Sequence, residues 1–272
     1  MLRVIPTLLV SGGELVKTRR FKNPVYVGDP RNVVRILNEK EVDELILLDI
    51  RASKDDVEPD YDLIEDIVSE AFMPVCFGGG VRTVAQARRL LRLGMEKISV
   101  NTAALADRNI VSRLAAEFGS QCVVASIDVR RDARGRAHVH SHCGAPIPEA
   151  DPLRWAQSLV ELGAGEVLVQ SVDREGTQLG FDLELLRSFD GRLAKPLIVG
   201  GGAGSLEDMK EALRACRPSA LSIGARFVFY GPLQGVLVTY LDPSDMKELA
   251  AFQTSTRGAG ELRHQPGNLV SG

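Results

Sequence analysis

Two runs of three glycines give this sequence two candidate phosphate sites. They stand at 78–80 and 200–202, each after a short apolar stretch and before an amphipathic one. Glycine has no side chain to keep a ligand away from its backbone N–H group, and a helix N-terminus attracts anions. Each run can therefore surround a phosphate. Asn101 with Thr102, and Gly224, follow other apolar stretches and can complete the two sites. The pair predicts a ligand with a phosphate at each end, while glycines that only permit tight turns are the alternative.

A carboxylate, Asp128, follows the apolar stretch 122–127. At the carboxyl end of a barrel strand such a group can hold or deliver a proton, whereas a helix cap or a surface ion pair is the alternative. An internal repeat, described below, pairs Asp128 with Leu9, whose aliphatic side chain cannot transfer a proton. Asp49 is a candidate for a second carboxylate, although an aspartate that caps a loop fits the same position.

Four charged residues stand where apolar strands are expected to start: Arg3, Glu44, Lys97 and Glu166. Charges at strand starts usually point to solvent. If these four turn inward, they form a neutral ionic ring across the barrel floor, and every member is needed because buried charges persist only when paired. Both arrangements are compatible with the sequence.

The segment 11–29 carries four basic residues, including Lys17. A long loop in a compact domain is usually functional, so we expect either a basic lid over an anionic ligand or a solvated loop. A second segment, 138–143, places three histidines on one side of an extended stretch. No further ligand is spaced convincingly, so we expect no metal, and Gly135 before it indicates a hairpin.

Short β-branched runs alternate with longer amphipathic stretches along the chain. Strands are expected to begin at Arg3, Glu44, Pro74, Lys97, Cys122, Glu166, Pro196 and Ser219. Helices are expected at 83–93 and 205–215, with Thr83 and Ser205 as N-caps. Apolar strands of this kind belong to a parallel sheet that is buried on both faces. Eight of them, each followed by a helix, predict an α/β fold with one (βα)₈ TIM barrel.

The barrel is predicted to consist of two half-barrel repeats. The stretch 74–80 recurs as 196–202, and 4–10 matches 123–129 at nearly the same spacing. Two halves of four βα units each explain both matches. We expect the barrel to occupy residues 1–252 and the polar segment 253–272 to form a disordered tail.

The composition excludes several classes of function. The 272 residues are 44% hydrophobic and 25% charged, and 33 basic against 36 acidic side chains leave a net charge of −3. This balance gives no reason to expect binding to nucleic acid or to a membrane surface. The four cysteines have no CxxC spacing and are expected to be reduced. The sequence therefore predicts a cytoplasmic protein without a cofactor.

Up to about residue 250, the chain resembles the cyclase subunit of imidazole glycerol phosphate synthase. The resemblance rests on the segments 118–121 and 172–177 and on the glycine run that continues through Gly204. It implies a half-repeat barrel that receives ammonia from a glutaminase docked at the barrel floor. At the far mouth the ammonia would react with a bisphosphorylated ribonucleotide, giving imidazole glycerol phosphate and the purine precursor AICAR.

The resemblance also assigns site residues. Phosphate binding would fall on Gly80, Asn101, Thr102, Gly176, Gly202 and Gly224, and a gate for ammonia on Arg3, Glu44, Lys97 and Glu166. It further implies a lid lysine at Lys17, a catalytic aspartate at Asp128, and an acidic docking residue for the glutaminase at Glu96.

The sequence departs from this pattern at Leu9, where the other catalytic aspartate is expected. Loss of a proton carrier typically removes orders of magnitude of rate, so the cyclase activity is in doubt while the ammonia path is kept. The chain is similar to bacterial paralogues from surface-polysaccharide gene clusters, which share Leu9. The resemblance implies ammonia supply, with a glutaminase at the N-terminal face, to a separate amidotransferase that makes an acetamidino sugar. The histidine-pathway cyclase is one alternative, and a scaffold that binds a phosphorylated small molecule is another.

Overall fold

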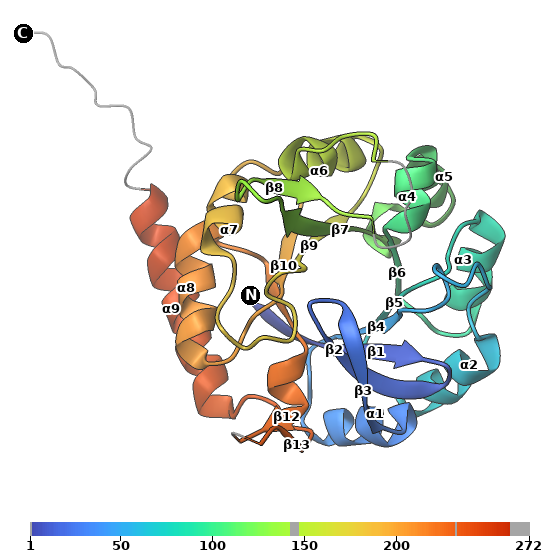
Figure 1. The fold of residues 1–272 in the computed structure, drawn as a ribbon, viewed down its shortest axis with the longest axis horizontal. Helices are drawn as coiled ribbons and strands as arrows, with labels where there is room; N and C mark the ends of the chain where they lie inside the picture. The colour runs from blue at the N-terminus through green and yellow to red at the C-terminus, as the bar shows by residue number, and fades with distance from the viewer. Residues whose placement is uncertain (1, 142–146, 232, 262–272) are drawn as a thin grey trace, which may run out of the picture.

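A computed structural model describes residues 2–141, 147–231 and 233–261, and it confirms the predicted (βα)₈ barrel (Figure 1). Eight parallel strands form the wall, and β11 pairs with β1 to close it. They are β1 (Arg3–Ser11), β4 (Leu45–Asp49), β5 (Val75–Gly78), β6 (Lys97–Val100), β7 (Val123–Arg131), β9 (Glu166–Ser171), β10 (Leu197–Gly200) and β11 (Ala220–Ile223). Each begins within one residue of its predicted start.

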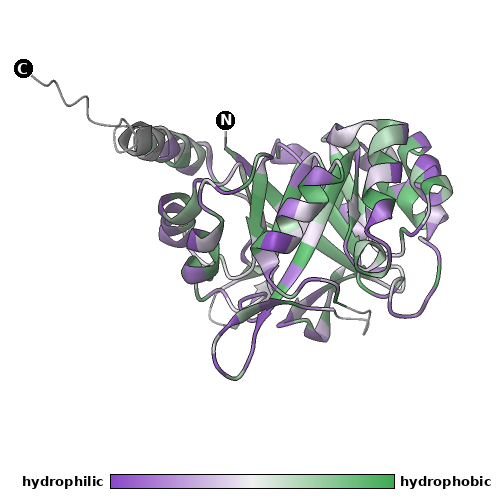
Figure 2. Cartoon of the chain, turned by 90° about the horizontal axis from the view of Figure 1, so that it is seen from above, coloured by the Kyte–Doolittle hydropathy of each residue, from purple (hydrophilic) through white to green (hydrophobic). Residues whose placement is uncertain are grey.

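Helices surround the closed sheet, and Figure 2 shows apolar strands inside with polar outer helix faces. They are α1 (Pro30–Glu39), α2 (Tyr61–Glu70), α3 (Val84–Arg92), α4 (Thr102–Ala106), α5 (Asn109–Phe118), α6 (Pro152–Glu161), α7 (Leu183–Phe189), α8 (Leu206–Cys216) and α9 (Pro243–Glu261), with 3₁₀ turns η1 (Ser120–Cys122) and η2 (Ala225–Phe227). Thr83 and Ser205 cap α3 and α8 as predicted, each in a capping box that satisfies two backbone donors.

Inside the barrel lies a separate apolar layer. It consists of Ile5, Ile46, Cys76, Val124, Leu168, Ile198 and Ala220, with Leu48 packed against it. All seven are at most 2% exposed. Because strand side chains alternate between the two faces of a sheet, these residues point into the barrel while their neighbours pack against the helices. The barrel is therefore filled at this level.

The segment 11–29 is a β-hairpin, so the prediction of a long loop was wrong. Strand β1 turns back as β2 (Glu14–Arg19), which pairs with β3 (Lys22–Gly28). Gly12, with φ +61°, allows the turn into β2. Leu15 and Val16 on β2 are both buried. Two buried apolar side chains favour a strand that pairs with its neighbours over a solvated loop.

The C-terminal segment also differs from expectation. Helix α9 continues past Gln253 to Glu261, so the first part of the expected disordered tail is helical. Gln253 is 4% exposed and its Nε2 donates to the backbone oxygen of Pro218 at 3.1 Å, which ties α9 to the barrel. Residues 262–272 lie outside the described part of the chain. A second small sheet pairs β12 (Phe229–Tyr230) with β13 (Gly235–Val236) before α9.

The predicted hairpin around Gly135 is present, with β8 (Ala137–Val139) paired to β7. His138 Nε2 lies 3.1 Å from Asp132 Oδ2. His142, one of the three histidines of the metal alternative, lies outside the described residues, and the described ones contain no group of three potential metal ligands. None of the described helices has the length and apolar character needed to span a membrane.

Candidate functional site

A cavity of about 160 Å³ opens at the carboxyl ends of the barrel strands. Its wall includes Leu9 from β1, Asp49 from β4, Asp128 from β7 and Glu175 from the segment after β9. In barrels of this kind the active site is built at this end of the strands. The cavity is therefore the candidate functional site.

The Asp128 carboxyl group can change its protonation state near neutral pH. Burial raises the pKa of this carboxyl to about 7, against a hydrogen bond from Asn101 that lowers it. In that bond, Asn101 Nδ2 donates to Asp128 Oδ2 at 2.8 Å. The negative charge of Glu175 raises the pKa further. A pKa near the working pH is what a proton donor or acceptor needs.

Leu9 lines the same cavity as its repeat partner Asp128 and is 6% exposed. The first half of the barrel therefore contributes an aliphatic side chain to the cavity wall at the position where the second half contributes the carboxylate of Asp128. Asp49, the other predicted carboxylate, accepts hydrogen bonds at Oδ1 from the backbone nitrogens of Arg51 (2.8 Å) and Ala52 (3.0 Å). Asp49 lines the cavity, but one of its oxygens caps the following loop, as the alternative reading of the sequence held.

Glu175 is a buried carboxylate that the sequence reasoning did not single out. It is 6% exposed, and Gln170 Nε2 donates to it. Burial raises the pKa of Glu175, while the nearby charge of Lys17 lowers it. It lies within the segment 172–177 that carries the family resemblance, but only the closed barrel shows that its side chain reaches the cavity of Asp128.

Lys17 lies on β2 and is not an exposed lid residue. It is 1% exposed, and its Nζ donates to the backbone oxygen of Thr7 at 2.5 Å. Burial lowers the pKa of Lys17 to about 8, partly opposed by the charge of Glu175. Strand β2 therefore places the Lys17 ammonium group in the protein interior, close to Glu175.

The two predicted phosphate sites have different surroundings. Gly80, Asn101 and Thr102 all line the cavity, and the Gly80 backbone nitrogen donates to Ser53 Oγ at 3.1 Å. The other predicted set does not line it: Gly176, Gly202 and Gly224.

The hairpin packs against two glycines of the second set, Gly176 and Gly224, whereas Gly202 packs against the backbone of Gly180. A methyl group on Gly176 would lie 2.1 Å from the backbone oxygen of Thr18. One on Gly224 would lie 2.3 Å from Lys17 Nζ. Arg20 adds a bond from its backbone nitrogen to the Glu175 backbone oxygen at 2.8 Å. The structure therefore brings together only the first predicted set around the cavity.

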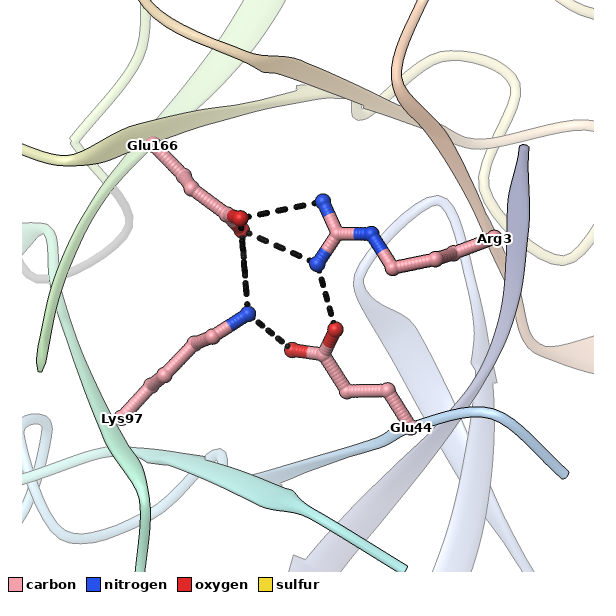
Figure 3. Close-up of polar contacts among 4 residues, drawn as sticks. All are labelled: Arg3, Glu44, Lys97 and Glu166. Atoms are coloured by element: carbon pink, nitrogen blue, oxygen red, sulfur yellow. Dashed lines mark hydrogen bonds and ion pairs between the residues drawn. The ribbon is translucent and has the colours of Figure 1, made fainter. Parts of the chain in front are cut away.

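At the opposite end of the barrel, the four charged strand-start residues turn inward and form a closed ring (Figure 3). Arg3 lies 2.5 Å from Glu44 and 3.0 Å from Glu166. Lys97 lies 2.8 Å from Glu44 and 3.4 Å from Glu166. Each cation contacts both anions, so the ring is neutral. The apolar layer around Ile46 separates it from the cavity.

The fold and the site define a (βα)₈ barrel protein with an ionic ring at one end of the barrel and a small cavity lined by carboxylates at the other. The chain belongs to the family described as "Histidine biosynthesis protein", whose profile matches residues 3–233, and within it to the HisF-like barrels.

Three relatives support this assignment. A Pseudomonas aeruginosa protein, provisionally named imidazole glycerol phosphate synthase subunit hisF2, is 48% identical over 88% of this chain and 96% of its own length. A Leptospira interrogans protein with the provisional subunit name HisF is 42% identical, covering 91% and 98%. A Vibrio vulnificus protein, provisionally named subunit hisF3, is 41% identical, covering 90% and 95%.

Proposed function

We propose that this chain is an ammonia-supplying barrel subunit that works with a glutaminase and serves the synthesis of an acetamidino sugar. The proposal rests on a difference between the two ends of the barrel: the residues at the floor are all present, and one carboxylate at the mouth is missing. The ionic ring of Arg3, Glu44, Lys97 and Glu166 is complete, while Leu9 occupies the position that faces Asp128 at the mouth.

The apolar layer favours transport of neutral ammonia. Charged groups lose several kcal/mol of solvation when they are buried without a partner, whereas a small neutral molecule does not carry this penalty. Cys76 and Ala220 contribute the smaller side chains of the layer. Because the layer fills the barrel, ammonia crosses only when these side chains move apart, and the cost in solvation is then much lower for ammonia than for ammonium.

The floor also offers features suited to a partner. Phe72, just before β5, is 89% exposed, and its backbone nitrogen is held at 3.0 Å by Asn38 Oδ1. Glu96, just before β6, is exposed and lies next to Lys97 of the ring. An exposed aromatic side chain on a fixed backbone and an exposed acidic residue at the same end of the barrel are features of a docking surface. We assign this face to the glutaminase.

The first test measures cyclase chemistry directly. The purified chain receives ammonium salt and the bisphosphorylated ribonucleotide, and we expect turnover roughly 10²–10⁴-fold below that of a cyclase that has both carboxylates. Turnover at the level of such a cyclase would overturn the proposal.

The second test follows the ammonia path. In a mixture of this chain, a glutaminase and a sugar amidotransferase that forms an acetamidino product, Arg3→Ala should lower glutamine-dependent formation of that product. Formation from added ammonium salt should stay unchanged, because that route does not need the ring. Equal glutamine-dependent rates for the two forms would favour a scaffold without ammonia flow.

The histidine-pathway cyclase is the second candidate, and Glu175 is the observation in its favour. This second carboxylate lines the cavity of Asp128 and could share the proton transfers that Leu9 cannot perform. Growth of a histidine auxotroph that carries this chain in place of its own cyclase subunit would support this candidate. Failure to grow, with the protein present in the cells, would exclude it.

A further inference from the structure

A pocket of about 250 Å³ lies on the mouth face of the barrel, outside the cavity described above. We call it the rim pocket, and its charged side chains are Arg20, Arg131, Asp173, Arg174 and Asp182. They come from the turn between β2 and β3, from the end of β7, and from the segment that leads from β9 to α7. Figure 1 shows the hairpin turn beside this segment, and a backbone hydrogen bond of 2.8 Å joins the two. Among the described residues, none lines both the rim pocket and the cavity, so the rim pocket is a separate site.

Both carboxylates of the rim pocket already have cationic partners. Asp182 accepts hydrogen bonds from Arg131 at 2.7 and 2.8 Å, one at each oxygen. Asp173 Oδ2 accepts the backbone N–H of Arg131 at 2.8 Å, and the side chain of Arg130 lies 3.7 Å from Asp173 Oδ1. Arg131 also contacts Glu184 at 3.2 Å, but the Glu184 side chain is 81% exposed and is therefore screened by water. These pairs leave little net charge in their part of the pocket.

Arg20 and Arg174 supply a positive charge that is not compensated. Neither forms an ion pair with a carboxylate in the described part of the chain. Arg20 Nε donates to the backbone oxygen of Asp173 at 3.0 Å. Arg174 Nη1 donates to the backbone oxygen of Leu179 at 3.2 Å. The backbone oxygens orient both guanidinium groups without neutralising them, so N–H groups of both remain able to bind an anion.

Two such groups in one pocket favour a phosphate over a carboxylate. A phosphate ester carries about 1.5 to 2 negative charges near neutral pH and three acceptor oxygens, whereas a carboxylate carries one charge and two oxygens. Arginine forms paired, charge-assisted hydrogen bonds with either group, and a phosphate has enough oxygens to accept from two arginines at once. The rim pocket is therefore suited to a phosphate.

The rim pocket differs from the second predicted phosphate set, although it adjoins it. A methyl group on Gly202 would lie 2.1 Å from the backbone oxygen of Gly180 and 3.1 Å from Cβ of Arg174. The segment after β9 therefore packs against the glycine run and presents Arg174 to the rim pocket. A phosphate in this pocket contacts arginine side chains, not the backbone N–H groups of the glycines.

We propose that the rim pocket binds the phosphate group of a phosphorylated small molecule through Arg20 and Arg174. The ligand lies beside the opening of the barrel, because Phe21 follows Arg20 in the chain, Glu175 follows Arg174, and both Phe21 and Glu175 line the cavity. The proposal goes beyond the proposed function and does not depend on it. Phosphate binding needs neither a glutaminase nor an ammonia path, so it is tested on this chain alone.

The test is a titration of the full-length chain with inorganic phosphate at pH 8, monitored by the NMR signals of the arginine Nε–H groups. Sodium acetate is titrated in parallel at the same ionic strength. We expect a saturable shift with phosphate and an affinity for acetate that is weaker by about ten-fold or more, since acetate cannot engage both guanidinium groups. Equal affinities for phosphate and acetate, or no saturable phosphate shift, would overturn the proposal.

Variants distinguish this pocket from a general attraction of anions to a basic surface. Arg20→Gln and Arg174→Gln each remove one guanidinium group and should each weaken phosphate binding by about ten-fold. Arg19→Gln is the matched control, because Arg19 is exposed, precedes Arg20 in the chain and does not line the pocket. It should change the affinity by less than about two-fold. Circular dichroism establishes that each variant is folded. An equal loss in Arg19→Gln, or unchanged affinity in both folded pocket variants, would refute the proposed site.

The cavity is the alternative location for a phosphate, because Gly80 and the rest of the first predicted set line it. Its three carboxylates oppose an anion there. The backbone N–H signals of Thr177, which lines the rim pocket, and of Gly80 separate the two locations. We expect phosphate to shift the Thr177 signal with the same affinity as the arginine signals. A saturable shift at Gly80 without one at Thr177 would place the phosphate in the cavity and contradict the proposal.

Discussion

Replacement of Glu44 by glutamine tests whether the floor ring is an interdependent ionic unit. The Glu44 carboxylate contacts Arg3 at 2.5 Å and Lys97 at 2.8 Å, and its side chain is only 4% exposed. Glutamine keeps the size and removes the charge. Two cations then share one anion, Glu166, and the ring carries an uncompensated positive charge at the end of an apolar barrel.

The expected loss follows from the burial of the ring. An exposed ion pair contributes about 0.2–1 kcal/mol, whereas removal of one member of a buried pair costs about 3–5 kcal/mol. The side chains of Arg3 and Lys97 are 24% and 16% exposed, which places this ring between the two limits. We therefore expect Glu44→Gln to lower the free energy of unfolding by about 2–3 kcal/mol.

Urea unfolding followed by circular dichroism measures this loss, with Glu39→Gln at an exposed position on α1 as the control. The double variant Glu44→Gln/Lys97→Met restores a neutral ring and should recover at least half of the loss. A loss below about 1 kcal/mol would show that these contacts act as ordinary surface pairs. Additive effects in the double variant would refute the claim that the ring acts as a unit.

Three further predictions concern the mouth and the frame that supports it. Folding raises the pKa of Asp128 to about 7, so its contribution favours the folded state at low pH and is lost as the pH rises toward 7. Asp128→Asn should therefore stabilise the protein by about 1–3 kcal/mol at pH 8 and by little at pH 4, and equal effects at both pH values in urea unfolding would contradict this. Gly176→Ala places a methyl group against the Thr18 backbone and should cost about 1–3 kcal/mol more than Gly135→Ala, which has a similar positive φ but open space. Thr83→Ala should cost about 0.5–2 kcal/mol in the same assay, and Thr83→Ser should restore most of it, because the hydroxyl caps α3.

The strands and helix caps could be predicted from short sequence patterns because both depend mainly on neighbouring residues. A run of apolar, β-branched residues favours a buried strand whatever its partners are, and this located all eight barrel strands. The helix caps at Thr83 and Ser205 depend on the next three residues only. The segment 11–29 was misassigned because its pairing with β1 depends on a turn at Gly12, which a search for long polar loops does not detect.

Contacts between distant residues explain what the sequence could not predict about the site. Whether Arg3 and Lys97 point inward depends on the closure of the barrel, since β11 must pair with β1 before their side chains can meet those of Glu44 and Glu166. Glu175 is an ordinary acidic residue in a polar segment until the fold buries it beside Asp128.

The sequence by itself determined the half-repeat barrel, the complete set of ring residues and the aliphatic replacement at Leu9, because each is a matter of residue type and spacing. Only the tertiary structure decided that the hairpin buries Lys17 and covers Gly176, and that the carboxylates of Asp49, Asp128 and Glu175 line one cavity. Charge and hydrogen bonding in a cavity depend on which side chains lie within a few ångströms of one another. That distance is fixed by the closure of the barrel and by the packing of the hairpin over its mouth.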